Sequence, residues 1–224
     1  MKMKNSMYFE ITDADVIAAT KRFRNKLNED GKSKRGPFFN GTQAWSFDKN
    51  DIELFKNAVW QGYLDASRTF HGIKGTDKNK GAFLKLAKSI QAYFKDDKSF
   101  DHNRWCKAFI ADIIKFNHYE ARYGQAQKAI NMAFKYLFCC DNIDEQTRKK
   151  FDPCHMPLDQ YTLAWYFLQG GNLLLEWSYL SQEQYETIST DIRTILGNDT
   201  LRAELVIWQA MKPKIINLKS KLTV

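Results

Sequence analysis

The sequence predicts an all-α protein, and three observations carry this prediction. Apolar residues recur every three or four positions along most of the chain, which is the period of an amphipathic helix. No segment alternates between apolar and polar residues as a half-buried strand would. With 44% hydrophobic and 14% aromatic residues, the 224-residue chain can bury a large core. We therefore expect one compact domain of about eight to ten helices, with two lobes around a central cleft.

The N-terminal half is expected to contain four helices. Thr12 or Asp13 can cap the first helix, which runs to about residue 29, and a loop containing glycine and proline follows over residues 31–45. The other three helices are expected at roughly 50–70, 82–94 and 104–116, with a glycine-rich loop over 71–81 between the first two.

The C-terminal half begins with an expected helix over about 125–138. A polar stretch over 141–157 follows, with room for one helical turn, and Pro153 and Pro157 keep the residues before them extended. A further helix starts at Asp159. The last two are expected at about 181–196 and 200–211, and Pro213 stops the final one.

The charge of the chain favours a partner that is itself anionic. Lys and Arg total 34 against 26 Asp and Glu, a formal net charge of +8, which favours nucleic acid or an anionic surface over a neutral partner. A basic protein without such a partner is the alternative. No apolar run approaches the roughly 18–20 residues that a membrane span requires, and the N-terminus lacks the apolar core of a secretory signal. We expect a cytoplasmic protein that does not bind membranes.

The cysteines do not predict a disulfide framework or a metal site. Four cysteines in a chain of this length are more typical of buried, reduced thiols. A zinc site could be assembled from Cys139, Cys140, Cys154 and His155, but adjacent cysteines fit tetrahedral ligation poorly. The sequence also lacks the common nucleotide-binding and metalloprotease motifs. We therefore expect no metal and no organic cofactor.

Lys128 and Asp159, 31 positions apart, are the residues most indicative of chemistry. Lys128 lies near the start of an expected helix, where the helix dipole would lower its pKa and favour the neutral amine that a nucleophile requires. On a helical wheel it shares one side with Asn131 and Lys135. Asp159 is expected to cap the next helix, and a capped carboxylate stays ionised. The alternative is that Lys128 is an ordinary surface lysine and Asp159 only a cap.

Three segments of the C-terminal half share their order and spacing with the motifs of an enzyme family. The motifs are Gln127-Lys128 and Lys135-Tyr136 on one helix, Pro157-Leu158-Asp159 at the start of another, and Glu204 followed four positions later by Trp208. Together they resemble the helix-hairpin-helix DNA glycosylase superfamily, and most closely its archaeal 8-oxoguanine glycosylase branch. The resemblance covers about residues 124–213.

The resemblance implies a bifunctional DNA glycosylase and AP lyase that removes a damaged or modified base such as 8-oxoguanine. Lys128 would attack C1′ of the flipped nucleotide and form a Schiff base, and Asp159 would stabilise the cationic sugar. Glu204 and Trp208 would hold the extruded base. The family has Asp at the position of Glu204, and it carries a Leu-Pro-Gly-x-Gly hairpin that this sequence lacks.

The resemblance also implies the partner and the division of the chain. Residues 121–213 would form the catalytic part of a single helical domain spanning 1–224, with residues 1–120 as an unassigned helical part. The partner would be double-stranded DNA with a modified base, bound by a monomer. Gly124, Lys149 and Lys150 would contact the DNA backbone.

Two other functions are compatible with the sequence. One is a non-catalytic helical protein that binds nucleic acid or another partner, with Lys128 at its surface. The other is a HEPN-like ribonuclease, because Arg148 and His155 loosely match the Arg-x4–6-His signature of that class.

Overall fold

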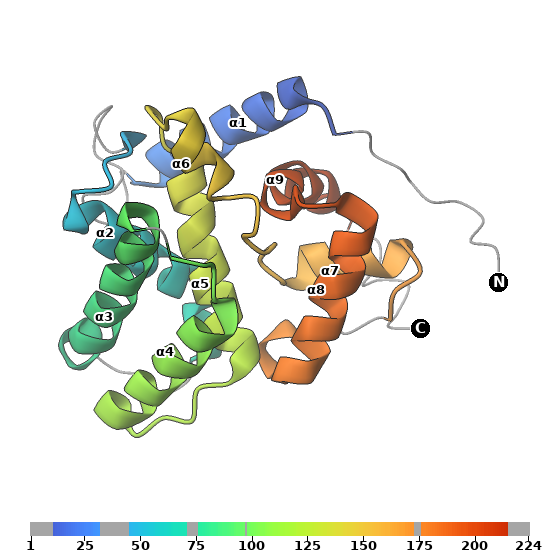
Figure 1. The fold of residues 1–224 in the computed structure, drawn as a ribbon. Coiled ribbons are helices and arrows are strands. Elements are labelled where there is room, and N and C mark those ends of the chain that lie inside the picture. The colour runs from blue at the N-terminus through green and yellow to red at the C-terminus, as the bar shows by residue number, and fades with distance from the viewer. Residues whose placement is uncertain (1–10, 32–44, 71–75, 97, 173–175, 215–224) are drawn as a thin grey trace.

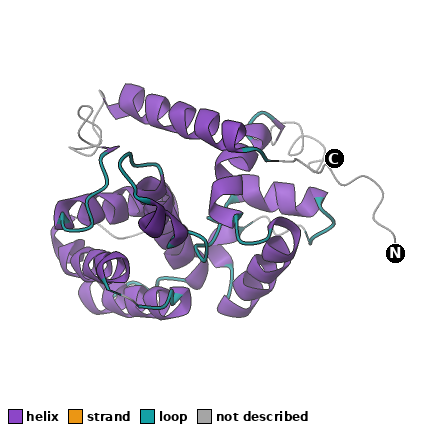
Figure 2. Cartoon of the chain, turned by 45° about the horizontal axis from the view of Figure 1, so that its top comes forward, coloured by secondary structure: helices purple, strands orange, loops and turns teal. Residues whose placement is uncertain are grey.

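The computed structural model describes residues 11–31, 45–70, 76–96, 98–172 and 176–214. Within these ranges the chain forms nine α-helices and two short 3-10 helices, and its only strand-like pairing is one isolated bridge between Ser46 and Asp141 (Figures 1 and 2). The predicted all-α class is confirmed. The elements are α1 (Asp13–Gly31), α2 (Ile52–Ala66), η3 (Ser67–Thr69), α3 (Thr76–Lys95), α4 (His102–Asn117), α5 (Tyr123–Phe138), α6 (Glu145–Lys149), α7 (Gln160–Leu168), η4 (Trp177–Tyr179), α8 (Gln182–Leu196) and α9 (Thr200–Met211).

Most helices begin where a short polar side chain can cap them. Five caps each accept a hydrogen bond from a backbone amide in the first turn that follows, and these are Asp51, Asp101, Asp144, Asp159 and Ser181. A side-chain acceptor satisfies one of the amides that a helix start leaves without an intrahelical partner. The helix starts expected near residues 50, 104, 159 and 181 therefore lie within about two residues of the observed ones.

The expected loop over residues 71–81 is wrong in its second half. α3 already begins at Thr76 and includes Gly81. A single glycine lowers helix stability by only about 1 kcal/mol, which tertiary packing overrides. Here the Phe116 ring lies against the face of α3 at Gly81, 3.1 Å from where a β-carbon would stand. Residues 71–75, and most of the loop expected over 31–45, lie outside the described residues.

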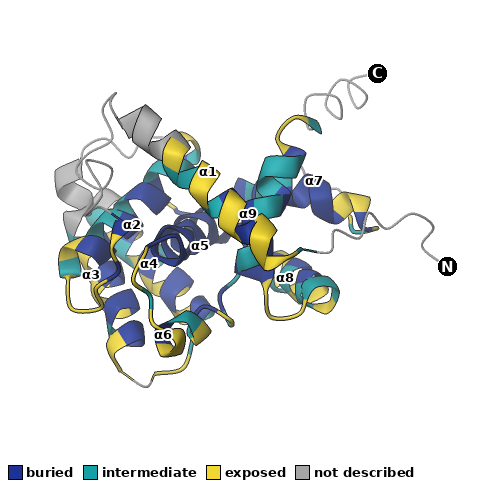
Figure 3. Cartoon of the chain, turned by 90° about the horizontal axis from the view of Figure 1, so that it is seen from above, coloured by how far each residue is buried: buried dark blue, intermediate teal, exposed yellow. Residues whose placement is uncertain are grey.

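α5 is the central helix of the structure. All of its residues are buried, and it appears dark blue along its length when the molecule is seen from above (Figure 3). Helices α2, α3 and α4 gather on one side of it and α7, α8 and α9 on the other (Figure 1). Both faces of α5 must therefore find partners, which decides where its polar side chains go.

The contact between α2 and α5 is close enough to require a glycine. A β-carbon on Gly62 would lie 2.1 Å from the carbonyl oxygen of Ala129 and 2.9 Å from the amide nitrogen of Ala133. Both neighbours are backbone atoms, which cannot move aside as a flexible side chain can. Gly62 therefore sets how near the two helix backbones lie.

α1 crosses over α9 and ties the two ends of the described chain together (Figure 3). Arg22 Nε donates to Gln209 Oε1 at 2.6 Å, and Gln209 Nε2 donates to the carbonyl of Ala19 at 2.8 Å. Arg202 on α9 also pairs with Asp13 in the first turn of α1. In the described part of the chain, none of the helices combines the length and the apolar character needed to cross a lipid bilayer.

Candidate functional site

The polar face of α5 points toward the C-terminal helices rather than toward water. The helical wheel places Lys128, Asn131 and Lys135 on one side of α5, and all three are buried. They contact the segment that precedes α7, and they also contact α8 and α9. The opposite, apolar face packs against α2 and α4. This side of α5 therefore carries a row of buried polar groups, each with a partner from the C-terminal part of the chain.

Lys128 and Asp159 form the first of two buried ion pairs in the described part of the chain. Lys128 Nζ lies 2.6 Å from Asp159 Oδ2, and the two residues are only 5% and 6% exposed. The other carboxylate oxygen, Oδ1, caps α7 by accepting from the amides of Tyr161 at 2.8 Å and Thr162 at 3.1 Å. One carboxylate thus holds both the start of α7 and the ammonium group of α5.

The segment before α7 is fixed against α5 by an amide side chain. Gln127 Nε2 donates to the carbonyl of Leu158 at 2.8 Å, and its Oε1 accepts from the Leu158 amide at 3.2 Å. Asn131 Nδ2 adds a bond to the carbonyl of Met156 at 3.3 Å. This two-way contact between Gln127 and Leu158 places Asp159 within reach of Lys128, the next residue along α5.

Burial and charge act in opposite directions on this pair. Burial alone would lower the pKa of Lys128, but the carboxylates of Asp159 and then Glu204 outweigh it and raise that pKa. Burial would raise the pKa of Asp159, but the Lys128 charge and the hydrogen bonds it accepts lower that pKa below its usual range. The resting pair is therefore an ammonium and a carboxylate. The expectation that the helix dipole lowers the pKa of Lys128 is wrong, because the carboxylates dominate.

Lys135 and Glu204 form the second buried ion pair, two turns further along α5. Lys135 Nζ lies 2.6 Å from Glu204 Oε2, and the two side chains are 2% and 0% exposed. The ammonium also faces the rings of Phe23 at 4.6 Å and Trp208 at 5.3 Å. Burial raises the pKa of Glu204, although Lys135 and then Lys128 oppose the change. Both pairs therefore belong to one electrostatic cluster.

Glu204 and Trp208, the residues expected at an extruded base, lie beside Lys135. Among the described residues, Glu204 Oε1 has no hydrogen-bond partner although it is buried. The Trp208 ring packs edge-on against Tyr161, with centroids 5.6 Å apart, and Tyr161 follows Asp159 by two residues. Glu204 thus contacts Lys135, two turns along α5 from Lys128, and Trp208 contacts Tyr161, which follows Asp159.

The three residues expected at the DNA backbone have other contacts in the structure. The amide of Gly124 donates to the carbonyl of Leu180 at 3.0 Å, and a β-carbon there would lie 2.1 Å from the carbonyl oxygen of Trp177. Lys150 Nζ donates to the carbonyls of Tyr93 and Asp96 near the end of α3. Lys149 is exposed and pairs with Glu145 at 3.1 Å. Of the three, only Lys149 is exposed, and Lys150 is half-buried.

Arg148 and His155, the pair of the ribonuclease alternative, lie in different surroundings. Arg148 Nη1 donates to the carbonyl of Phe138 at 3.0 Å, whereas His155 Nδ1 is 2.8 Å from the Tyr185 hydroxyl. Burial, aided by the charge of Arg193, lowers the pKa of His155 to about 4. The ring is therefore neutral near pH 7 and cannot act there as a protonated acid.

The cysteines are buried and unpaired. Cys106, Cys139, Cys140 and Cys154 all carry free thiols, and burial raises the pKa of each. No group of three or more potential metal ligands comes together in the described residues. These thiols are accordingly protonated and pack as small apolar side chains.

The chain was compared with protein-family models, with curated proteins and with solved structures, and none of the three comparisons finds a match. The candidate site therefore rests on its own geometry. Sequence reasoning missed the pairing of Lys135 with Glu204. The available signal was the shared wheel side of Lys128 and Lys135, because two lysines on one side of a buried helix require two carboxylates.

Proposed function

We propose that this protein is a DNA glycosylase with AP lyase activity, in which Lys128 is the nucleophile and Asp159 its proton partner. The observation that supports the proposal best is the buried contact of 2.6 Å between Lys128 Nζ and Asp159 Oδ2. An amine nucleophile requires a base within hydrogen-bonding distance and a site from which water is largely excluded. The net positive charge of the chain favours approach to DNA.

Because the pKa of Lys128 is raised, the reaction must first remove a proton from its ammonium group. The ammonium has to lose a proton before it can attack, and Asp159 is the group in contact with it. When a nucleotide displaces the remaining water from the pair, the charged forms lose solvation, and transfer of the proton from Lys128 to Asp159 becomes easier. The neutral amine then faces C1′ of the flipped sugar.

The remaining steps balance through the same carboxyl group. The Lys128 nitrogen bonds to C1′ while the bond from C1′ to the base breaks, and the departing base takes the proton held by Asp159. The new C1′ ammonium returns a proton to Asp159. Opening of the C1′–O4′ bond, with that proton passing to O4′, leaves a Schiff base. The Asp159 carboxylate then takes a proton from C2′, and the electron pair of that C–H bond expels the 3′ phosphate by β-elimination.

The experiment is borohydride trapping on duplexes that carry 8-oxoguanine, uracil, an alkylated base or an abasic site. Reduction of the Schiff base should fix a covalent adduct, and peptide mapping of the wild-type adduct should place it on Lys128. Mapping does not depend on whether a variant folds. A folded protein that traps no duplex at low salt would overturn the proposal, as would an adduct that maps to another lysine.

Variants sharpen this result. Lys128→Gln should trap nothing, whereas Lys135→Gln, which removes the other buried lysine of α5, should still trap if it folds. Circular dichroism should accompany each variant, because either change leaves a carboxylate buried without its counter-charge. Equal loss of trapping in two folded variants would argue against a specific role for Lys128.

One observation favours a second candidate, a non-catalytic binding protein on the same scaffold. Lys135 and Glu204 are buried and paired as closely as Lys128 and Asp159, and this second pair is not needed for the lyase chemistry. Two such pairs could both serve to fix α5 against α7 and α9. Binding to duplex DNA that ignores the lesion and survives Lys128→Gln would support this candidate.

A further inference from the structure

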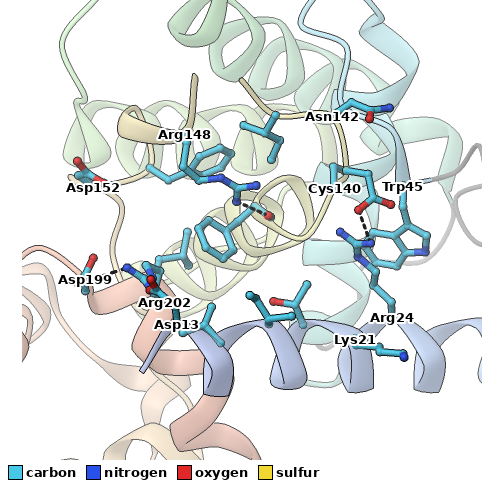
Figure 4. A pocket seen from close by; sticks show the side chains of 18 of the residues that line it. Asp13, Lys21, Arg24, Trp45, Cys140, Asn142, Arg148, Asp152, Asp199 and Arg202 are labelled. Carbon is cyan, nitrogen blue, oxygen red and sulfur yellow. Dashed lines mark hydrogen bonds and ion pairs between the residues drawn. The ribbon is translucent and has the colours of Figure 1, made fainter. Parts of the chain in front are cut away.

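A concave region lies at the C-terminal end of α5, away from Lys128. It is a cavity of about 1250 Å³ between α1, the end of α5, α6 and the start of α9 (Figure 4). We call it the Arg148 cavity. Among the described residues, its basic lining residues are Lys21, Arg24, Arg148 and Arg202, and Lys128 does not line it. An inference about this cavity is therefore independent of the proposed function.

The three arginines of the cavity come from three different helices. Arg202 already pairs with Asp13, whereas Arg24 and Arg148 retain free donors. Arg24 Nη1 pairs with Asp141 at 2.7 Å, but its Nε is buried and has no hydrogen-bond partner among the described residues. Arg148 donates to the carbonyl of Phe138 and forms no ion pair within the described part of the chain. A guanidinium group has five N–H donors, so Arg24 and Arg148 can still donate to an anion.

The charges of these arginines act on one another across the cavity. Burial lowers the pKa of Arg148. The positive charges of Arg24 and Arg202 act in the same direction, and Cys139 and Cys140 oppose them. Guanidinium groups that repel one another in a half-buried wall are stabilised by an anion between them. Figure 4 shows the three side chains approaching the hollow from different sides.

Four carboxylates of the described residues also line the cavity, and they are more exposed than the arginines. The side chains of Asp13, Asp141 and Asp199 are 84%, 58% and 60% exposed, and Asp152 is exposed as well. Arg24 and Arg202 are only 21% and 33% exposed. The negative charges therefore stand at the solvent edge, where water and salt screen them, and the positive charges lie deeper.

The start of α9 adds to the positive potential. Asp199 occupies the N-cap position but makes no side-chain cap, and its carboxylate lies 3.7 Å from Arg202 Nη1 instead. Amides in the first turn of α9 thus lack a side-chain acceptor at the edge of the cavity, which Leu201 and Arg202 line. Uncapped helix starts attract anions, and here Arg202 lies in the first turn of the helix.

We propose that the Arg148 cavity binds the phosphate group of a nucleotide through Arg24 and Arg148, while Arg202 adds positive charge further along the wall. A phosphate offers several oxygens and as many as two charges, and it can therefore accept from two guanidinium forks at once. The volume leaves room for a sugar and base beside the phosphate. The nucleotide can be a free mononucleotide or part of a nucleic-acid strand.

Calorimetric titration of the full-length protein tests this proposal. The probes are inorganic phosphate, a deoxynucleoside 5′-monophosphate, the matching nucleoside, and a short oligonucleotide without terminal phosphates. The nucleoside should not bind. Saturable binding of the monophosphate would identify a terminal phosphate as the ligand group, and binding of the oligonucleotide alone would identify a phosphodiester. No saturable binding of any phosphate-bearing probe would overturn the proposal.

Substitutions of cavity residues show whether the probes bind in the Arg148 cavity. Arg148→Gln and Arg24→Gln should each weaken binding about ten-fold or more, because a charge-assisted hydrogen bond is lost. Arg104→Gln is the matched control, since Arg104 is exposed on α4 and does not line the cavity. Equal weakening by Arg104→Gln, or none by the two cavity variants, would overturn the proposal.

Arg148 holds a backbone carbonyl, so its variant can lose stability. Modification of the wild-type protein by phenylglyoxal provides a measurement that needs no substitution. The bound probe should protect Arg24 and Arg148 but leave the modification rate of Arg104 unchanged. Unprotected cavity arginines at a saturating probe concentration would contradict the proposal.

Discussion

The Lys135 ammonium and the Glu204 carboxylate lie 2.6 Å apart, with at most 2% of either side chain exposed. Replacing one member of such a pair leaves the other charge buried without compensation. We expect Glu204→Gln to lower the free energy of unfolding by about 3–5 kcal/mol. Urea denaturation followed by circular dichroism measures this loss.

A double substitution serves as the control for that measurement. Lys135→Met combined with Glu204→Leu removes both charges and should restore much of the lost stability, because apolar residues of similar volume often replace a buried pair without net cost. A double variant as unstable as Glu204→Gln would mean that packing, and not the unpaired charge, causes the loss.

Asp159 both caps α7 and pairs with Lys128, and two substitutions separate these roles. Both Asp159→Asn and Asp159→Ala leave Lys128 without a counter-charge, but asparagine keeps an oxygen that can cap α7. We therefore expect Asp159→Ala to be about 1 kcal/mol less stable than Asp159→Asn in urea denaturation. Equal stabilities would show that the cap contributes little.

The same two variants also address the proposed chemistry. Both should reduce the rate of adduct formation by about 100-fold or more, since each removes the proton acceptor of Lys128. A variant that kept the wild-type rate would exclude Asp159 as the proton partner.

Acid should destabilise the protein through its buried histidines. His155 has a pKa of about 4 in the folded state, and an exposed histidine has one near 6.5. Between these values the unfolded chain binds more protons than the folded chain, so stability is lost as the pH falls through this window. Burial also lowers the pKa of His102, which stacks on His155, and this histidine acts in the same direction.

His155→Gln isolates this effect. The variant should lose less stability than the wild type between about pH 6.5 and pH 4, by no more than about 3 kcal/mol, because one pKa unit corresponds to about 1.4 kcal/mol. Glu204 contributes with the opposite sign, since its pKa is raised, but it does so in both proteins. Urea midpoints at several pH values give the difference, and parallel curves would contradict the prediction.

Two glycines in helices should respond in opposite ways to alanine. Gly62→Ala places a methyl group against the backbone of α5 and should cost about 1–3 kcal/mol, as overpacking does. Gly81→Ala meets only the edge of the Phe116 ring, and it should be neutral or stabilise α3 by up to about 1 kcal/mol. Thermal unfolding of the two variants side by side tests this contrast, and a similar loss in both would refute it.

The helices were largely predictable because their signals are local. The cap at Asp159 and the period of apolar residues can be read without knowing what packs where. The pairing of Lys128 with Asp159 was a hypothesis from motif spacing, and the structure brings the two groups into contact. The start of α3 was missed because a run of polar residues with a glycine has no apolar period that would mark it as helical.

The electrostatics of the site could not be predicted in the same way. A helical wheel placed Lys128, Asn131 and Lys135 on one side of α5, but it could not show that α7, α8 and α9 cover that side. The surface alternative for Lys128 is excluded only by burial, which depends on the whole fold. For the same reason Gly124 seemed suited to a phosphate, whereas the chain uses it for close contact with η4.

The shared use of Asp159 links folding to the protonation of a single amine. Its two oxygens hold α7 and the Lys128 ammonium at the same time, and both contacts rely on an ionised carboxylate. Transfer of the Lys128 proton to Asp159, as proposed above, would neutralise that carboxylate and weaken the cap on the first turn of α7. Local opening of α7, followed by hydrogen exchange at the amides of Tyr161 and Thr162, would then report the ionisation of Lys128 without any substrate present.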